Sequence, residues 1–443
     1  MADRLVVIGG DAAGMSAATN ARRGRPDLEI VVLEQGAHTS YSACGIPSVV
    51  SGSVGALDEL VVRTPQEFRD GFRIDVRTRH EVKAIDLDAR RIEVRAIDQA
   101  RTLHLGFDLL HLATGSRPMR PDLPGIDGPD IYGVQTLGDA EVLLEAIRSR
   151  PRRAVTVVGA GSIGLEMAEA FVRRGARVTL VDSNPLPMRT FDPDMGARIA
   201  AAVRRFGIEL RTGTRVEGFE PGRVHTGTGA IDADLVILGL GVTPNSAIGI
   251  DAGLDAGAAG AIAVDHRQRT SREGIYAAGD CADTRHQVSG GRVHVALGTV
   301  ANKTGRVAGL NVGGGYATFP GVLGTAITQV CEVEIARTGL SQDQADAAGI
   351  EYEIGVVEAT TRAGYYPGAE PLHAKVLAEK GSGRLIGGQL VGADRAGKRI
   401  DTLAAAITAR MTASSFVDLD LAYAPAVSPM WDAFQLAARS TLG

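Results

Sequence analysis

The sequence predicts an α/β protein with two Rossmann-like domains and a smaller C-terminal α+β domain. A strand, a glycine-rich turn, a helix and a second strand follow one another twice, over residues 5–34 and 154–182. Each unit starts with an apolar run of strand length, as the buried strands of a parallel sheet do. From about Phe319 the pattern changes to alternating strands followed by helices near 398–411 and Phe416, which indicates a separate α+β module. At 443 residues the chain is long enough for three domains.

The composition, 44% hydrophobic and 22% charged residues, is typical of a globular protein. The net charge of −5 argues against nucleic acid or an anionic membrane as the main partner. The first strand pattern begins at Leu5, which leaves no room for a signal peptide, and no apolar run is long enough to span a bilayer. We therefore expect a cytoplasmic protein.

Three cysteines, Cys44, Cys281 and Cys331, are too far apart to indicate a disulfide framework or a metal site. Cys44 lies in the segment SYSACGIPSVVSG, in which Pro47 suits the first turn of a helix. A thiol at a helix N-terminus has a stabilised thiolate, so we expect a lowered pKa and a nucleophilic Cys44. The alternative is a buried structural cysteine, which is common for free thiols and is our expectation for Cys281 and Cys331.

The first repeated unit has most of a dinucleotide-binding fingerprint. Gly9 allows the tight turn after the strand, Gly14 allows close packing of the helix, and Glu34 can accept a hydrogen bond from a ribose hydroxyl. Asp11 replaces the middle glycine, where backbone normally approaches a pyrophosphate. This departure weakens the motif when it is taken alone.

The second unit carries the fingerprint in full, with Gly159, Gly161 and Gly164, and it ends in Asp182. Two such units in one chain indicate that one holds a flavin and the other a nicotinamide dinucleotide. An acidic residue at the ribose favours NADH, whereas the 2′-phosphate of NADPH favours arginine. Because Arg189 lies a few residues further on, NADPH stays possible.

The order of the motifs resembles that of the pyridine nucleotide-disulfide oxidoreductases. After the first fingerprint come the Cys44 segment, ATG at 113–115, the second fingerprint, GVTPN at 241–245 and the Gly279–Asp280 pair. SACGIP at 42–47, GYYPGAE at 364–370 and YAP at 423–425 are similar to the single-cysteine branch of coenzyme A-disulfide reductases, NADH oxidases and peroxidases, and persulfide reductases. Spacing also favours this branch, because Val49 stands where two-cysteine members carry the second thiol.

The resemblance implies an FAD-binding domain (1–117 and 246–318) split by an NAD(P)H-binding domain (118–245), and a dimerisation domain (319–443) in a homodimer. It implies contacts with FAD or NAD(P)H from Gly9, Asp11, Ala12, Ala13, Gly14, Glu34, Gln35, Cys44, Val82, Thr114, Gly115, Gly159, Gly161, Ser162, Ile163, Gly164, Glu166, Asp182, Gly241, Gly279, Asp280, Leu297 and Gly298. Tyr423, with Tyr365 or Tyr366, would reach the partner subunit's cysteine and act as a proton donor or hydrogen-bond partner to the departing thiolate.

The expected activity is the reduction of a small disulfide or persulfide, CoA-disulfide above all, with electrons that pass from NAD(P)H through FAD to a mixed disulfide on Cys44. Ser16, Asn20, Arg23 and Ser40 resemble the CoA-binding positions of the reductases, although Phe72 and Trp431 replace expected basic residues. One alternative is an NADH oxidase or peroxidase with a Cys44 sulfenic acid; Ala12, where those enzymes carry histidine, argues against it. Another is an NADH-binding flavoprotein that senses redox state.

Overall fold

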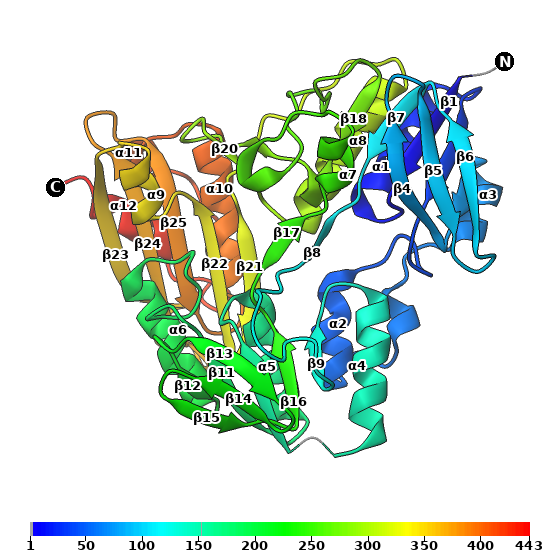
Figure 1. Ribbon diagram of the computed structural model, residues 1–443. Helices are drawn as coiled ribbons and strands as arrows, with labels where there is room; N and C mark the ends of the chain where they lie inside the picture. The colour runs from blue at the N-terminus through cyan, green and yellow to red at the C-terminus, as the bar shows by residue number, and fades with distance from the viewer. Residues whose placement is uncertain (1–2, 152) are drawn as a thin grey trace.

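The computed structural model describes residues 3–151 and 153–443, and its chain forms three domains (Figure 1). The first domain has a five-stranded parallel sheet in the order β18-β7-β1-β2-β3. Its strands are β1 (Arg4–Ile8), β2 (Glu29–Leu33), β3 (Asp75–Arg77), β7 (Leu109–Leu112) and β18 (Ile275–Ala277). The sheet is completed by β18, a strand that follows the whole second domain in the sequence.

Helices α1 (Ala12–Gly24) and α8 (Gly298–Val312) pack closely against each other on this sheet. A Cβ atom at Gly305 would lie 2.2 Å from the carbonyl oxygen of Ala13, and one at Gly309 would lie 2.3 Å from that of Ala17. Only glycine permits such a short distance between the two helix backbones. The domain also contains α3 (Pro65–Phe72), α7 (Ala247–Asp251) and an antiparallel sheet of β4 (His80–Asp86), β5 (Arg91–Ala96) and β6 (Arg101–Gly106).

The second domain repeats this plan with a parallel sheet in the order β12-β11-β10-β16-β9. Its strands are β9 (Ile131–Gly133), β10 (Ala154–Val158), β11 (Arg177–Val181), β12 (Glu209–Arg211) and β16 (Leu235–Leu238), with helices α4 (Leu137–Ser149), α5 (Ser162–Arg173) and α6 (Pro193–Arg205). An antiparallel sheet of β13 (Val216–Glu220), β14 (Arg223–Thr226) and β15 (Gly229–Asp232) is added. The paired strands β8 (Ser116–Pro118) and β17 (Val242–Pro244) carry the chain into and out of this domain.

The C-terminal domain is an antiparallel sheet in the order β21-β22-β25-β24-β23, covered by helices (Figure 1). The strands are β21 (Ala326–Val330), β22 (Val333–Gly339), β23 (Tyr352–Thr360), β24 (Pro371–Glu379) and β25 (Leu385–Gly392). The helices are α9 (Gln342–Ala347), α10 (Ile400–Thr408), α11 (Ala413–Val417) and α12 (Ala433–Arg439). The α+β module predicted from the sequence is therefore present, with α9 and α12 as additional helices.

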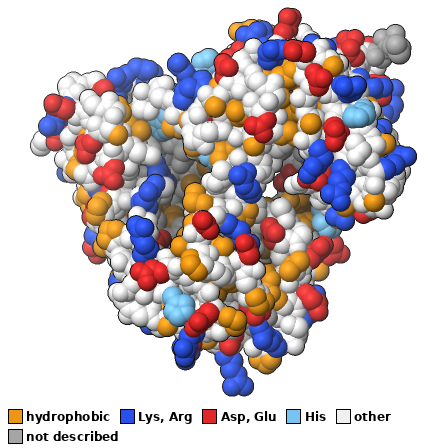
Figure 2. Space-filling view, viewed as in Figure 1, with side chains coloured by type: hydrophobic (Ala, Val, Ile, Leu, Met, Phe, Trp, Pro, Cys, Tyr) orange, Lys and Arg blue, Asp and Glu red, His pale blue; other side chains and the backbone are white. Residues whose placement is uncertain are grey.

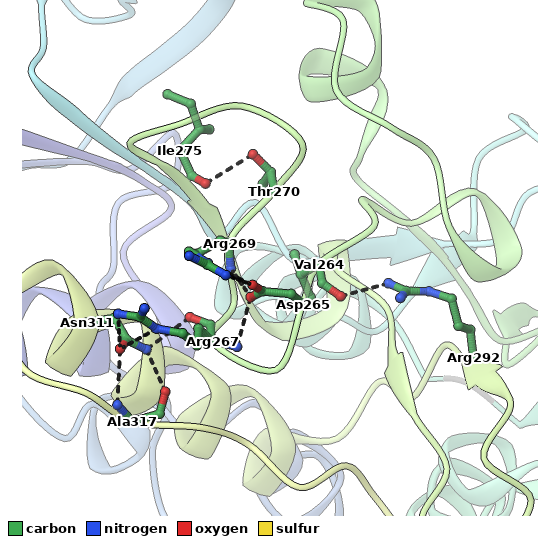
Figure 3. Close-up of polar contacts among 9 residues, drawn as sticks. All are labelled: Val264, Asp265, Arg267, Arg269, Thr270, Ile275, Arg292, Asn311 and Ala317. Carbon is green, nitrogen blue, oxygen red and sulfur yellow. Dashed lines mark hydrogen bonds and ion pairs between the residues drawn. The ribbon is translucent and has the colours of Figure 1, made fainter.

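Asn311, in the last turn of α8, holds the chain that leads to this domain (Figure 3). Its amide group donates to the carbonyl oxygens of Arg267 and Ala317, and its Oδ1 accepts from the Ala317 amide and the Arg267 guanidinium. These bonds fix the glycine-rich turn at 313–315 against the first domain. No helix in the described part of the chain is both long and apolar enough to cross a membrane.

Candidate active site

A cavity of about 2000 Å³ lies where the three domains meet, and the surface of the molecule is hollowed beside the C-terminal domain (Figure 2). The residues that follow β1, β7, β10, β11 and β16 line it. Ligands of open parallel sheets bind at the carboxyl ends of the strands, so this is the position in which a dinucleotide is expected. The volume is larger than one ordinary ligand needs.

The first crevice has the backbone that its fingerprint predicts. Gly9 has φ +106°, and a Cβ atom there would lie 2.1 Å from the Ala113 carbonyl oxygen. A Cβ atom at Gly14 would lie 1.9 Å from the Gly9 carbonyl oxygen, so only glycine lets α1 pack this closely against the turn. Gly14 itself does not line the cavity. Asp11, in place of the missing glycine, is the N-cap of α1 with an extended backbone at φ −109°, and its Oδ1 accepts a hydrogen bond from the Tyr41 amide at 3.1 Å.

Three carboxylates face this crevice, and burial raises the pKa of each. Asp11 has its pKa raised to about 6 by burial and by the nearby charges of Glu34 and Asp280. Glu34 accepts hydrogen bonds from the Gly10 and Gly36 amides, and Asp280 accepts one from the Ser116 hydroxyl. Carboxylates partly removed from water beside a large cavity are suited to the hydroxyl groups of a ribose or ribityl chain. The residues present therefore fit FAD.

The second crevice is built in the same way on β10 and α5. Gly159 has φ +103°, and a Cβ atom at Gly164 would lie 1.9 Å from its carbonyl oxygen. Asp182 follows β11 and accepts hydrogen bonds from the Ala160 amide at 2.6 Å and the Asn184 amide at 2.7 Å. Its carboxylate is thereby held at the edge of the cavity, where a nicotinamide dinucleotide would place its adenosine ribose.

Cys44 lies on the cavity wall between the two crevices. It occupies a short 3₁₀ turn (Ala43–Gly45), and α2 (Ile46–Ser51) begins directly after it, as the sequence predicts. Helix α2 packs against α5 of the second domain, where Arg174 donates to the Val50 carbonyl oxygen at 2.9 Å. The thiol is exposed, whereas Cys281 and Cys331 are buried, as expected.

The prediction of a lowered Cys44 pKa is wrong for the protein chain alone. The cavity wall removes part of the water around the thiol, and this desolvation raises the pKa of Cys44. The negative charge of Glu166 raises it further. The backbone amide of Cys44 acts in the opposite direction but is outweighed. Helix α2 has only six residues, so its dipole is too small to dominate.

Most of the sequence-predicted cofactor positions are brought together here. The cavity is lined by Gly9, Asp11, Ala12, Ala13, Glu34, Gln35, Cys44, Val82, Thr114, Gly115, Gly159, Gly161, Ser162, Ile163, Glu166, Asp182, Gly241, Gly279, Asp280, Leu297 and Gly298. Gly14 and Gly164 lie behind it. Of the predicted substrate positions only Ser40 reaches the cavity wall; Ser16, Asn20 and Arg23 lie on α1 away from it.

The three tyrosines lie on the C-terminal domain and do not line the cavity of their own chain. Tyr365 is 78% exposed, Tyr366 37% and Tyr423 44%. A hydrogen bond with Tyr365 raises the pKa of Tyr423, so the two phenols are neighbours. Within one subunit the structure does not bring them to Cys44.

Thr328, Arg337 and His294 also line the cavity, although they are not among the residues predicted from the sequence. His294 lies 2.7 Å from the Asp280 carbonyl oxygen, and its place shortly before Leu297 could have indicated it. Thr328 donates a hydrogen bond to Glu166. It lies in an alternating strand pattern of the C-terminal domain, and nothing in that pattern marks it as a cavity residue. Among the described residues, no three His, Cys, Asp or Glu side chains could hold a metal ion.

Comparisons with known proteins agree with this geometry. The sequence profile "Pyridine nucleotide-disulphide oxidoreductase" matches residues 3–305, and that of its dimerisation domain matches 325–433. An NAD(P)H sulfur oxidoreductase (CoA-dependent) from Pyrococcus furiosus is 37% identical over 98% of both chains. An NADH oxidase from Methanocaldococcus jannaschii is 33% identical over 99% of this chain and 98% of its own length.

A solved structure of an NAD-dependent persulfide reductase from A. fulgidus superposes with a TM-score of 0.95 and 37% identity. The match covers 99% of this chain and 82% of the other chain. The first profile spans the two crevices, the second spans most of the C-terminal domain, and the superposition covers both parts. The chain therefore belongs to the pyridine nucleotide-disulphide oxidoreductase family.

Proposed function

We propose that this protein uses NAD(P)H to reduce a low-molecular-weight disulfide or persulfide, with Cys44 as its single redox-active thiol. One observation carries the proposal: the exposed Cys44 thiol lies on the wall of the cavity between the two dinucleotide crevices. Both other cysteines are buried and lie outside that wall. A lone thiol in this position needs an external sulfur as its partner.

CoA-disulfide is the substrate that we favour. The Pyrococcus furiosus relative is named as CoA-dependent, and the A. fulgidus relative is named as a persulfide reductase. We propose that Ser16, Asn20, Arg23 and Ser40 contact the CoA part, with the Arg23 guanidinium placed to meet a phosphate. Ser40 lines the cavity together with Cys44, and Arg23 is exposed in the last turn of α1, which supports a substrate that extends from the cavity onto the surface of α1.

The chemistry at Cys44 balances with one disulfide and one NAD(P)H. The Cys44 thiolate attacks one sulfur of RSSR, a protein–SR bond forms, and the S–S bond breaks to release the first RS⁻. FAD, when bound, supplies the two electrons of NAD(P)H that break the protein–SR bond and release the second RS⁻. Glu166 lies near enough for its negative charge to act on Cys44, and burial raises the pKa of its own carboxyl group.

The cofactor assignment follows the two crevices. We propose that 1–117 and 246–318 form the FAD-binding domain, that 118–245 form the NAD(P)H-binding domain, and that 319–443 form the dimerisation domain. The Asp182 carboxylate favours NADH over NADPH, because the 2′-phosphate would lie against a negative charge. We expect a cytoplasmic homodimer in which three tyrosines donate a proton or a hydrogen bond to the thiolate that leaves the cysteine of the other subunit. These are Tyr365, Tyr366 and Tyr423, and their exposure in the single chain supports this arrangement.

The test is the Cys44→Ser variant, assayed for NADH consumption with CoA-disulfide or a persulfide. We expect turnover to fall at least about a hundredfold while NADH still bleaches the flavin, because only the sulfur step is lost. Cys331→Ala is the control, since it removes a thiol outside the cavity, and it should keep full activity. Undiminished turnover of Cys44→Ser would overturn the proposal.

The second candidate function is an NADH oxidase, which the name of the Methanocaldococcus jannaschii relative favours. Ala12 argues against it, because it places no imidazole in the first glycine turn to move protons at a sulfenate. Steady NADH consumption with oxygen as the sole acceptor, as fast as with any disulfide, would favour the oxidase.

A further inference from the structure

Residues 182–191 of the second domain form one wall of the cavity beside the second crevice. Seven of them line it: Asp182, Ser183, Asn184, Met188, Arg189, Thr190 and Phe191. At its start this segment is held within its own domain, by hydrogen bonds from the Ala160 and Asn184 amides to Asp182. Its end is held differently, by side chains of the C-terminal domain.

Lys375 on β24 is the centre of that second attachment. Its side chain is only 2% exposed, and its Nζ lies 2.9 Å from Asp192 Oδ2 and 2.8 Å from Asp194 Oδ1. The same ammonium group donates to Gln342 Oε1 at 2.6 Å. Lysine is almost never buried to this extent unless it is paired. The two carboxylates belong to the N-terminus of α6, directly after the cavity segment.

Two further side chains of the C-terminal domain bind the same stretch of backbone. Gln389 Oε1 on β25 accepts from the Asp192 amide at 2.9 Å, and Arg337 on β22 donates to the Thr190 carbonyl oxygen at 2.6 Å. We call Arg337, Lys375 and Gln389 the latch. All three are at least nine-tenths buried, so the contact lies inside the interface between the two domains.

A buried ion pair such as that of Lys375 is not needed to stabilise the contact between two domains. Removing an ammonium and a carboxylate from water costs several kcal/mol, and well-packed apolar residues often stabilise an interface equally well. What hydrogen bonds and ion pairs add is a defined geometry, here the position of Thr190 and Asp192 relative to the C-terminal sheet. That position fixes where the cavity segment stands.

We propose that Lys375 is a positioning residue for the nicotinamide dinucleotide. It fixes Asp192 at the start of α6 and thereby holds residues 182–191 in the conformation that binds the cofactor. The inference rests on the proposed function, since it takes the second crevice as the nicotinamide site. Lys375 itself does not line the cavity and acts only through the segment.

The experiment uses the flavin-loaded, full-length double variant Lys375→Met/Asp192→Asn, which removes both members of the fully buried ion pair together. We expect the KM and Kd for NADH to rise about tenfold, while kcat at saturating NADH changes less than about twofold. Hydrogen exchange of peptides covering 183–192, measured without NADH, should become faster, whereas flavin content should stay the same. The single variant Lys375→Arg, which keeps a positive charge beside Asp192, should retain most of the NADH affinity of the unaltered protein.

Two more variants make the result decisive. Lys380→Met removes an exposed ion pair of the same domain, with Glu353 at 3.8 Å, and should leave NADH affinity and exchange unchanged. Gln389→Leu removes only the acceptor of the Asp192 amide. It should accelerate hydrogen exchange and weaken NADH binding less than the double variant does. This variant tests the inference if the double variant fails to fold. NADH affinity that is unchanged in a folded variant, while the unaltered protein binds NADH, overturns the inference alone. Failure of the unaltered protein to bind NADH overturns the proposed function as well.

Discussion

The Glu166 carboxylate on α5 accepts a hydrogen bond from the Thr328 hydroxyl on β21, and its negative charge raises the pKa of the Cys44 thiol. These residues come from the second domain, the C-terminal domain and the first domain. The reactivity of the thiol is therefore set by groups that approach it only when all three domains are assembled.

Replacing Glu166 with Gln should lower the pKa of Cys44, because it removes a negative charge that opposes thiolate formation. Alkylation by iodoacetamide, followed against pH in the flavin-free protein, should then reach its half-maximal rate at a lower pH than in the unaltered protein. Thr328→Val is the matched variant: it leaves the carboxylate in place and should not produce this decrease. An unchanged or higher midpoint in Glu166→Gln would contradict the described electrostatics.

Cys44 should be the one thiol that reacts rapidly in the folded protein. Cys281 is fully buried and Cys331 is 4% exposed, and burial raises the pKa of Cys331 to about 12. Alkylation followed by peptide mass spectrometry should label Cys44 at least about a hundred times faster than the other two, because buried thiols react only after local opening. In concentrated urea all three should react at similar rates. Rapid labelling of Cys281 in the folded protein would refute the arrangement.

Asp11→Asn should stabilise the flavin-free protein at neutral pH. Folding raises the Asp11 pKa from 3.8 to about 6, so the folded state favours the protonated carboxyl, and stability is lost as pH rises through this window. The free energy of unfolding of the variant should therefore exceed that of the unaltered protein by a margin that grows between these pH values. A shift of this size corresponds to at most about 3 kcal/mol, reduced by water in the cavity. A margin independent of pH would contradict the assignment.

Alanine at Gly164 should affect stability, whereas alanine at Gly161 should affect NADH binding. A Cβ atom at Gly164 would lie 1.9 Å from the Gly159 carbonyl oxygen, so Gly164→Ala should lower the free energy of unfolding by about 1–3 kcal/mol. No atom lies within 4 Å of a Cβ atom at Gly161, so Gly161→Ala should leave stability within about 0.5 kcal/mol. It should instead raise the KM for NADH, because Gly161 lines the cavity and the added methyl group would face the pyrophosphate of a bound dinucleotide. Denaturant titration and kinetics measure the two effects separately.

Local patterns were sufficient to predict the fold class and much of the cavity wall. Glycines that need a positive φ, and strands that end at the same sheet edge, leave a periodic signal in the sequence, as Gly9 and Gly159 show. The family, the α/β fold class, the oxidoreductase activity with FAD and NAD(P)H, and the C-terminal dimerisation domain are confirmed by the profiles and relatives.

Long-range and small-scale features could not be predicted in this way. The antiparallel sheets β4–β6 and β13–β15 were missed because β4, β5 and β13 are rich in charged residues, β14 and β15 have four residues each, and none of these strands leads into a glycine motif. The Cys44 pKa was predicted with the wrong sign, since burial depends on elements that are distant in sequence. The ion pair between Lys375 and Asp192 joins residues 183 positions apart, and neither neighbourhood in the sequence indicates the other.

The most direct test of the account is mass spectrometry of the Cys44 peptide after the protein has been treated with CoA-disulfide in the absence of NADH. We predict a single CoA adduct on Cys44, which NADH removes with release of one CoA thiol per subunit. An adduct on Cys281 or Cys331, or an adduct on Cys44 that NADH does not remove, would contradict the role of Cys44 as the redox thiol.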